Sequence, residues 1–241
     1  MRMHRSRQTA GLLALAAAIT LTAVGCTTEP GPPASAVGSA SPSPSAQTGL
    51  WLAPQQLMAA ALPDAGIPDS YSSPVALRGS KGVNPRIKPS SEPACDRLFD
   101  AANARQKLHP TPTVAEQMFN WKNDFYGSGS VLASYEGSGA QETFAQARDS
   151  LSACRYYEQE GPAGLFKGTV TVAPAPQVGD EAVQFEVSAP TEMGSHVTQY
   201  TVVRTGKAIA TFKKGSDGQT GQAFPPALIA QQITLLQQAQ S

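Results

Sequence analysis

The stretch Glu181-Ala-Val-Gln-Phe-Glu-Val-Ser188 sets the pattern for the C-terminal half of this 241-residue chain. Its apolar and polar side chains alternate, with Val183, Phe185 and Val187 on one side and Gln184, Glu186 and Ser188 on the other. A period of two residues predicts a β-strand that turns one face toward a core.

Further strands are predicted on both sides of this stretch, over residues 168–173, 196–204 and 207–213. Thr205-Gly206 predicts a two-residue hairpin turn between the last two strands. Upstream, residues 114–121 and 130–136 predict a second hairpin. Each of its strands has an apolar face, formed by Ala115, Phe119 and Trp121 in the first and by Val131, Ala133 and Tyr135 in the second.

Helical spacing appears in two longer segments. Residues 139–154 place Phe144, Ala147, Leu151 and Cys154 on one face. A closing helix is predicted after Pro225-Pro226, with Leu228, Ile229, Ile233 and Leu236 facing inward and the glutamines facing out. Shorter helices are predicted after Pro54 and over 95–102, and residues 63–93 predict an irregular passage with one short strand.

Runs of strands with helices beside them indicate an α+β domain, in which helices flank an antiparallel β-sheet. We expect this domain to occupy residues 50–241 as a single unit.

Residues 1–25 have the layout of a secretory signal peptide. A short basic region with three arginines precedes an apolar, Ala/Leu-rich run, and small residues then lead to Cys26. The apolar run is shorter than the roughly 20 residues that span a bilayer. An uncleaved membrane anchor is the alternative.

The end of this region, Leu21-Thr-Ala-Val-Gly-Cys26, resembles the bacterial lipobox, with Ala23 at the position where Leu is commonest. The resemblance implies that the chain is cut before Cys26 and that diacylglycerol is attached to its thiol. Two acyl chains hold a protein stably on a membrane. We therefore expect a lipid-anchored protein on the extracytoplasmic face of the cell membrane.

Residues 26–49 are dominated by Pro, Ser, Ala and Gly, and Val37 is their one large aliphatic residue. Such a segment cannot bury enough apolar surface to order itself. It predicts a disordered tether with a reach of roughly 25 to 75 Å.

The chain contains three cysteines, an odd number that needs an explanation in an exported protein. If Cys26 carries lipid, Cys95 and Cys154 remain as a pair and predict one disulfide in an oxidising compartment. Two free, buried thiols are the alternative. A metal site is disfavoured because neither cysteine has another ligand at metal-binding spacing.

Charge and motifs exclude several functional classes. Three of the 18 basic residues precede Cys26 and all 18 acidic residues follow it, so the mature chain has a net charge of −3 and no basic block for nucleic acid. Nucleophile-elbow, Walker and dinucleotide-binding motifs are absent. His109 and His196 lack evident partners and are interpreted as surface histidines. No catalytic residue, cofactor or metal site is predicted.

Aromatic residues offer a candidate ligand groove. Trp121, Tyr126, Tyr135 and the pair Tyr156-Tyr157 could line a cavity together with Glu186. Ordinary core packing is the alternative for each aromatic residue. Turn chemistry at a strand entry explains Asp180-Glu181 without catalysis, and a hydrolase that uses Asp180 or Glu186 is a further alternative.

Several of these features together resemble the PknH-type extracellular sensor domains, which occur on actinobacterial receptor kinases and on stand-alone lipoproteins. The shared features are the lipobox, the Ser/Pro-rich tether, Cys95 followed by Leu98, the helix from Phe144 to Cys154, and Val178-Gly-Asp-Glu-Ala182 before paired strands and a terminal helix. The resemblance spans roughly residues 50–240. It implies a helix-flanked antiparallel sheet with a groove suited to a ligand, and it implies no enzyme activity. The family members carry two disulfides, whereas only one pair is available here.

Three functions follow as hypotheses. The first is a non-enzymatic, sensor-like binding protein for a small or cell-wall-derived ligand, or for a signalling partner in the envelope. The second is an envelope structural or assembly protein that acts through an exposed apolar patch. The third is a hydrolase with unrecognised catalytic residues. A cavity beside the sheet is what the first hypothesis requires.

Overall fold

The computed structural model describes residues 51–64, 67, 70–72, 74–79, 88–105, 109, 113–122, 124–162, 164–192, 194–217 and 223–241. The predicted signal peptide, Cys26 and the predicted tether lie outside the described residues.

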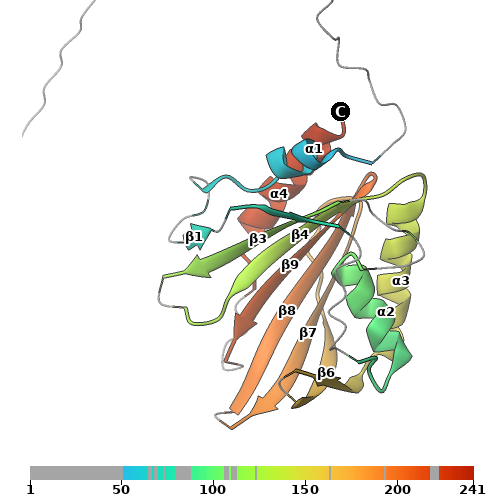
Figure 1. The fold of residues 1–241 in the computed structure, drawn as a ribbon, viewed down its shortest axis with the longest axis vertical. Helices are drawn as coiled ribbons and strands as arrows, with labels where there is room; N and C mark the ends of the chain where they lie inside the picture. The colour runs from blue at the N-terminus through green and yellow to red at the C-terminus, as the bar shows by residue number, and fades with distance from the viewer. Residues whose placement is uncertain are drawn as a thin grey trace, which may run out of the picture. The chain divides into compact units, whose positions relative to one another are not determined.

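The described chain forms a nine-stranded antiparallel sheet, shown in Figure 1. The strand order is β1-β3-β4-β9-β8-β7-β6-β5, and β2 also pairs with β3. The strands are β1 (Ser70–Ser72), β2 (Ala76–Arg78), β3 (Val114–Trp121), β4 (Ser128–Ser134), β5 (Tyr156–Gly161), β6 (Gly164–Ala173), β7 (Glu181–Thr191), β8 (Gly194–Thr205) and β9 (Ala208–Ser216). The last strand of the chain, β9, lies between β4 and β8 in the middle of the sheet.

Within the described residues, four helices cover the two faces of the sheet (Figure 1). They are α1 (Pro54–Ala59), α2 (Pro93–Ala102), α3 (Gly139–Ala153) and α4 (Pro226–Ala239). One core lies between α2, α3 and the sheet, and a second core joins α1 and α4 to the opposite face. The predicted α+β class, with helices flanking an antiparallel sheet, is confirmed.

The two central strands β4 and β9 are buried on both faces, because a core lies on each side of them. In β4, Val131 and Ala133 belong to the core under α2 and α3, whereas Leu132 belongs to the core under α1 and α4. In β9, Ile209 belongs to the core under α2 and α3, whereas Phe212 belongs to the core under α1 and α4. Strand β7 contacts a core on one face, which is why its sequence alternates so clearly.

Several predicted element boundaries were wrong. Strand β6 begins at Gly164 rather than at residue 168, and it pairs with β5, which was not predicted. The described residues within 63–93 form two short strands rather than one. The turn between β8 and β9 consists of Gly206-Lys207, because Thr205 pairs with Ala208. Gly206 supplies the positive φ of 54° that the turn requires.

The glutamines of α4 do not all face outward as predicted. Gln232 is fully buried. Its Nε2 donates to the carbonyl oxygen of Ala60 at the end of α1. Because the last carbonyls of a helix have no partner within the helix, this side chain satisfies one of them and ties α1 to α4.

Candidate functional site

A cavity of about 490 Å³ lies between α2 and the sheet. It is lined from α2 and the residues after it, from the segment before α2, and from strands β5, β8 and β9. The lining residues are Lys88, Pro89, Asp96, Phe99, Asp100, Asn103, Arg105, Tyr157, Gln159, Tyr200 and Lys213. Its volume lies within the roughly 300 to 1,000 Å³ typical of small-molecule sites.

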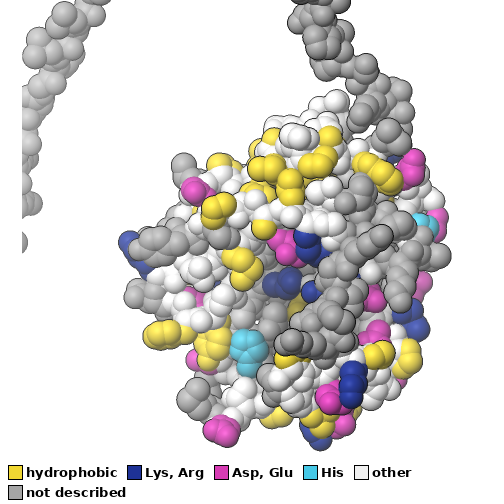
Figure 2. All heavy atoms as spheres, viewed as in Figure 1, with side chains coloured by type: hydrophobic (Ala, Val, Ile, Leu, Met, Phe, Trp, Pro, Cys, Tyr) yellow, Lys and Arg dark blue, Asp and Glu magenta, His cyan; other side chains and the backbone are white. Residues whose placement is uncertain are grey.

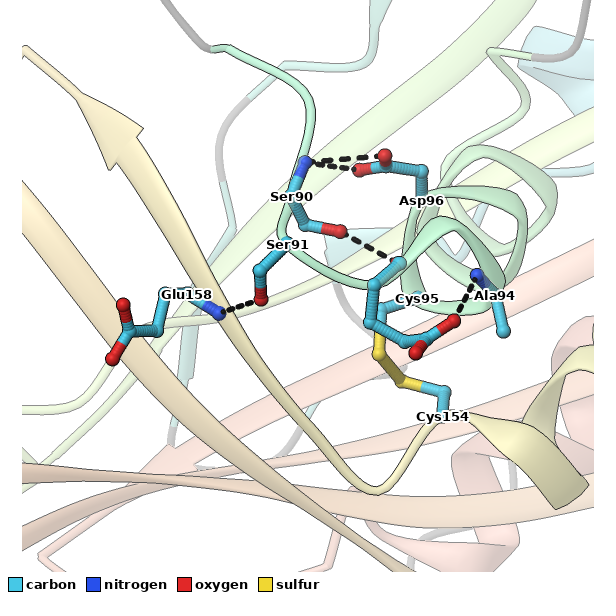
Figure 3. The surroundings of a disulfide bond; sticks show 8 residues. Ser90, Ser91, Ala94, Cys95, Asp96, Cys154 and Glu158 are labelled. Atoms are coloured by element: carbon cyan, nitrogen blue, oxygen red, sulfur yellow. Dashed lines mark hydrogen bonds between the residues drawn. A yellow bond between two sulfur atoms is a disulfide. The ribbon is translucent and has the colours of Figure 1, made fainter.

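A disulfide fixes one wall of this pocket. Cys95 near the start of α2 is bonded to Cys154, which follows α3 and immediately precedes β5 (Figure 3). Both cysteines are completely buried. The predicted pairing is confirmed. The bond holds α2 against β5, and both elements contribute to the pocket lining.

The segment 88–91 closes the edge of the sheet beside the disulfide. Its backbone donates from Lys88 N to Glu160 O at 3.0 Å and from Ser91 N to Glu158 O at 2.8 Å. The Ser91 hydroxyl accepts from Glu158 N at 2.9 Å, as Figure 3 shows. In the same view, Ser90 N donates to both carboxylate oxygens of Asp96. Contacts within the chain therefore hold this pocket wall in place.

Aromatic rings form the apolar part of the lining. The Phe99 ring lies 5.1 Å from Tyr157 and 6.1 Å from Tyr200, measured between centroids. Tyr200 in turn stacks on the buried Phe185 at 4.9 Å. Gly168 of β6 is paired with Tyr157, and a Cβ there would lie 2.6 Å from the tyrosine ring. The glycine thus leaves the space that this ring fills.

Lys213 of β9 lies in the pocket lining and has a perturbed pKa. Its Nζ donates to Asn103 Oδ1 at 2.7 Å. Burial lowers the pKa of Lys213 to about 8, and Arg105 and Arg78 lower it further while Glu116 opposes the shift. Burial also raises the pKa of Tyr200 to about 12 and raises that of Tyr157. At neutral pH the lysine is still mainly protonated, and both tyrosines are neutral donors.

A polar network lies at the same end of the pocket. Arg78 of β2 donates from Nε to Glu116 Oε1 and from Nη2 to Asn103 O, both at 2.6 Å. Asn103 is the residue that ends α2. Its side-chain amide donates back to Phe99 O at 2.7 Å. Figure 2 shows basic side chains, with an acidic one beside them, near the hollowed middle of this face.

Of the six residues predicted to line a groove, Tyr157 belongs to this lining and the other five do not. Tyr135 is 1% exposed in the core under α2 and α3. Trp121 packs on the opposite side of the sheet, 5.6 Å from Phe224. Because successive side chains of a strand point to opposite faces, Tyr157 enters the pocket whereas its neighbour Tyr156 is 50% exposed.

The two remaining groove candidates also lie elsewhere. Tyr126 follows β3 in the hairpin loop, and its ring lies 5.4 Å from the ring of His196. Glu186 of β7 accepts a hydrogen bond from Gln199 Nε2 at 3.3 Å. The other predicted surface histidine, His109, lies 2.7 Å from Glu142 Oε2 through its Nε2.

Sequence reasoning missed Lys213, Arg105 and Tyr200. The available signal was the position of Lys213 directly after the mainly apolar run Ala208–Phe212 of the strand. A lysine at such a position is rarely buried without a partner or a function. Which partners would meet it depended on the strand order, which the sequence pattern does not reveal.

The Val178-to-Ala182 segment has a structural role at the other end of the sheet. Asp180 Oδ2 accepts from Gly206 N at 2.7 Å and from Arg204 Nη1 at 2.9 Å. Glu181 accepts from Arg204 Nε at 2.7 Å. Gly179 has a φ of 68°, and a Cβ there would lie 2.6 Å from Arg204 O. These contacts fasten the β8–β9 turn to the start of β7.

Among the described residues, no three His, Cys, Asp or Glu side chains are grouped as metal ligands would be. No helix in the described part of the chain is long and apolar enough to cross a bilayer.

Comparison with solved structures identifies the architecture. The extracellular domain of PknH from Mycobacterium tuberculosis superposes with a TM-score of 0.52 at 10% sequence identity, over 78% of this chain and 92% of that domain. The chain shares the fold of the PknH extracellular domain. The resemblance to PknH-type domains predicted from the sequence is thus confirmed at the level of the fold.

An uncharacterised protein from Mycobacterium smegmatis also matches, with a TM-score of 0.41 at 13% identity over 76% of this chain and 94% of the other. No protein-family model and no curated protein matches the sequence.

Proposed function

We propose that this chain is a lipid-anchored, extracytoplasmic, sensor-like binding protein that holds a small ligand in the pocket between α2 and the sheet. The observation that carries the proposal is the pocket itself, a cavity of about 490 Å³ that combines aromatic walls with Lys213. The first of the three sequence hypotheses required such a cavity beside the sheet. The PknH-like fold agrees with a sensor-like role.

The anchor rests on the sequence of the N-terminal region. Cys26 stands at the end of a lipobox-like stretch and would carry diacylglycerol. The tether that follows would let the domain reach a small-molecule, cell-wall-derived or protein partner near the membrane.

The anchor is tested with Cys26→Ala in the native host. We expect the variant to leave the membrane fraction, because the thiol that would carry both acyl chains is gone. Retention of the variant in the membrane at the wild-type level would disprove the anchor.

The binding role is tested by native mass spectrometry of the full-length protein purified in detergent from its own host. We expect a retained small molecule that is lost in Gly168→Ala, because the added Cβ pushes Tyr157 out of the pocket wall. Gly161→Ala is the matched control, since its Cβ meets no atom within 4 Å and its backbone has no positive φ.

Circular dichroism and urea unfolding establish that both variants are folded. If Gly168→Ala is folded and the molecule is retained in it at the wild-type level, or if wild-type protein never carries one, the binding role is wrong.

A further inference from the structure

The end of the pocket around Lys213 is rich in cations. Arg78 and Arg105 act electrostatically on Lys213, and Glu116 is the carboxylate that opposes them there. Asp100, in the last turn of α2, adds a second carboxylate at this end, and the C-terminus of α2 adds about half a negative charge. Whether this end favours an anion therefore depends on which cationic donors lack an acceptor.

The acceptors around these cations are already engaged. Glu116 Oε1 accepts from Arg78, and the two oxygens of Asn103 accept from Arg78 and from Lys213. Arg78 Nη1 and Arg105 Nε are buried and have no hydrogen-bond acceptor among the described residues. A buried donor without an acceptor costs about 1 to 3 kcal/mol. Such donors favour an acceptor that comes from outside the chain.

Of the two acidic side chains of the lining, Asp96 lies near the start of α2, whereas Asp100 lies in its last turn. Asp96 precedes Asn103 by seven residues, which corresponds to about 10 Å along a helix, and both of its oxygens accept from Ser90 N. Asp100 also has an interaction of its own. At the rim, Lys88 is paired with Glu160 at 2.7 Å. The unpartnered donor Arg105 Nε and the amine of Lys213 therefore mark the place in the pocket where an acceptor from outside the chain would bind.

The aromatic part of the lining indicates a second chemical group that the ligand would carry. Phe99, Tyr157 and Tyr200 present ring surfaces, and the cavity is much larger than a single inorganic ion needs. Rings stack well on such walls, whereas the cations recognise a carboxylate or phosphate group.

We propose that this pocket binds an organic acid composed of a ring and one anionic group, with the ring against Tyr157 and Tyr200 and the anion beside Lys213 and Arg105. The inference rests on the proposed binding role and specifies its ligand class. A sugar acid and an aromatic acid share this chemistry.

The test is a calorimetric titration of the detergent-purified full-length protein at pH 7. The probes are glucuronate and benzoate, their neutral amides glucuronamide and benzamide, and inorganic phosphate. We expect at least one acid to bind at least tenfold more tightly than its amide and than phosphate. The acid that binds distinguishes a sugar source from an aromatic source.

Variants locate the binding. Lys213→Met is expected to weaken binding of the acid at least tenfold, and Arg105→Gln provides a second variant that leaves β9 untouched. Lys207→Met is the matched control, because it removes the same charge from an exposed turn residue and should change affinity less than twofold.

Equal binding of acid and amide, binding of phosphate as tight as that of the acids, an unchanged affinity in both pocket variants, or no binding of either acid at 10 mM would each overturn the proposal. If a neutral molecule is retained from the host while the acids fail to bind, the binding role stands and only the ligand class is wrong.

Discussion

Replacing Lys213 with methionine is expected to stabilise the fold while it weakens the proposed binding of acids. Burial lowers the pKa of this lysine from 10.5 to about 8. At 1.36 kcal/mol per pKa unit, the charged form is disfavoured in the folded state by roughly 3 kcal/mol. The variant also loses the hydrogen bond that Lys213 Nζ donates to Asn103 Oδ1, and this loss offsets about 1 kcal/mol of the gain. The variant should therefore gain about 2 kcal/mol at pH 7.

The pH dependence has a definite sign. Below pH 8 the amine of Lys213 is protonated in both the folded and the unfolded chain, so the full cost of burying its charge lowers the stability of the wild type. Between pH 8 and 10.5 the folded chain releases its proton before the unfolded chain does, and the wild type gains stability with rising pH. The advantage of Lys213→Met should shrink over that interval.

Urea unfolding at pH 7 and at pH 10, followed by tryptophan fluorescence with the disulfide intact, measures both effects. Lys207→Met controls for the change in net charge and is expected within about 0.5 kcal/mol of wild type. A Lys213→Met variant that is less stable than wild type at pH 7, or whose advantage is the same at pH 10, would refute the reasoning.

Three further predictions concern the pocket and the frame around it. Binding of an organic acid should weaken as pH rises through about 8, where Lys213 loses its charge, and titrations at pH 7 and 9.5 should show no such loss in Lys213→Met. Gly179→Ala should lower the free energy of unfolding by about 2 to 5 kcal/mol, because position 179 combines a positive φ with a close approach to Arg204 O. Gly137 has a φ of 55° and open space around it, so Gly137→Ala should lose only about 1 to 2 kcal/mol. Equal losses of the two variants in urea unfolding would contradict the steric argument. Replacing Cys95 and Cys154 together with alanine should cost about 4 kcal/mol, since the bond closes a 59-residue separation, and a melting temperature unchanged from wild type would show that the crosslink contributes nothing.

The sequence by itself determined most of the elements and the fold class. Strand β7 could be predicted because one face meets a core and the other does not, so alternation in the sequence reports its conformation directly. The helices around Phe144 and Ile233 were predictable for the same reason at helical spacing. The disulfide followed from there being two cysteines left once Cys26 was set aside.

The tertiary structure decided the pocket. The sequence named both Tyr156 and Tyr157 for a groove, but strand parity sends only Tyr157 into the pocket, and parity is fixed only when β5 pairs with β6. Arg78, Arg105 and Lys213 are separated by up to 135 positions in the sequence. They meet because β9 is inserted beside β4, β2 pairs with β3, and α2 ends over the same strands. Local patterns encode which face of an element is apolar, whereas the convergence of charges from distant segments depends on strand order, which no local pattern contains.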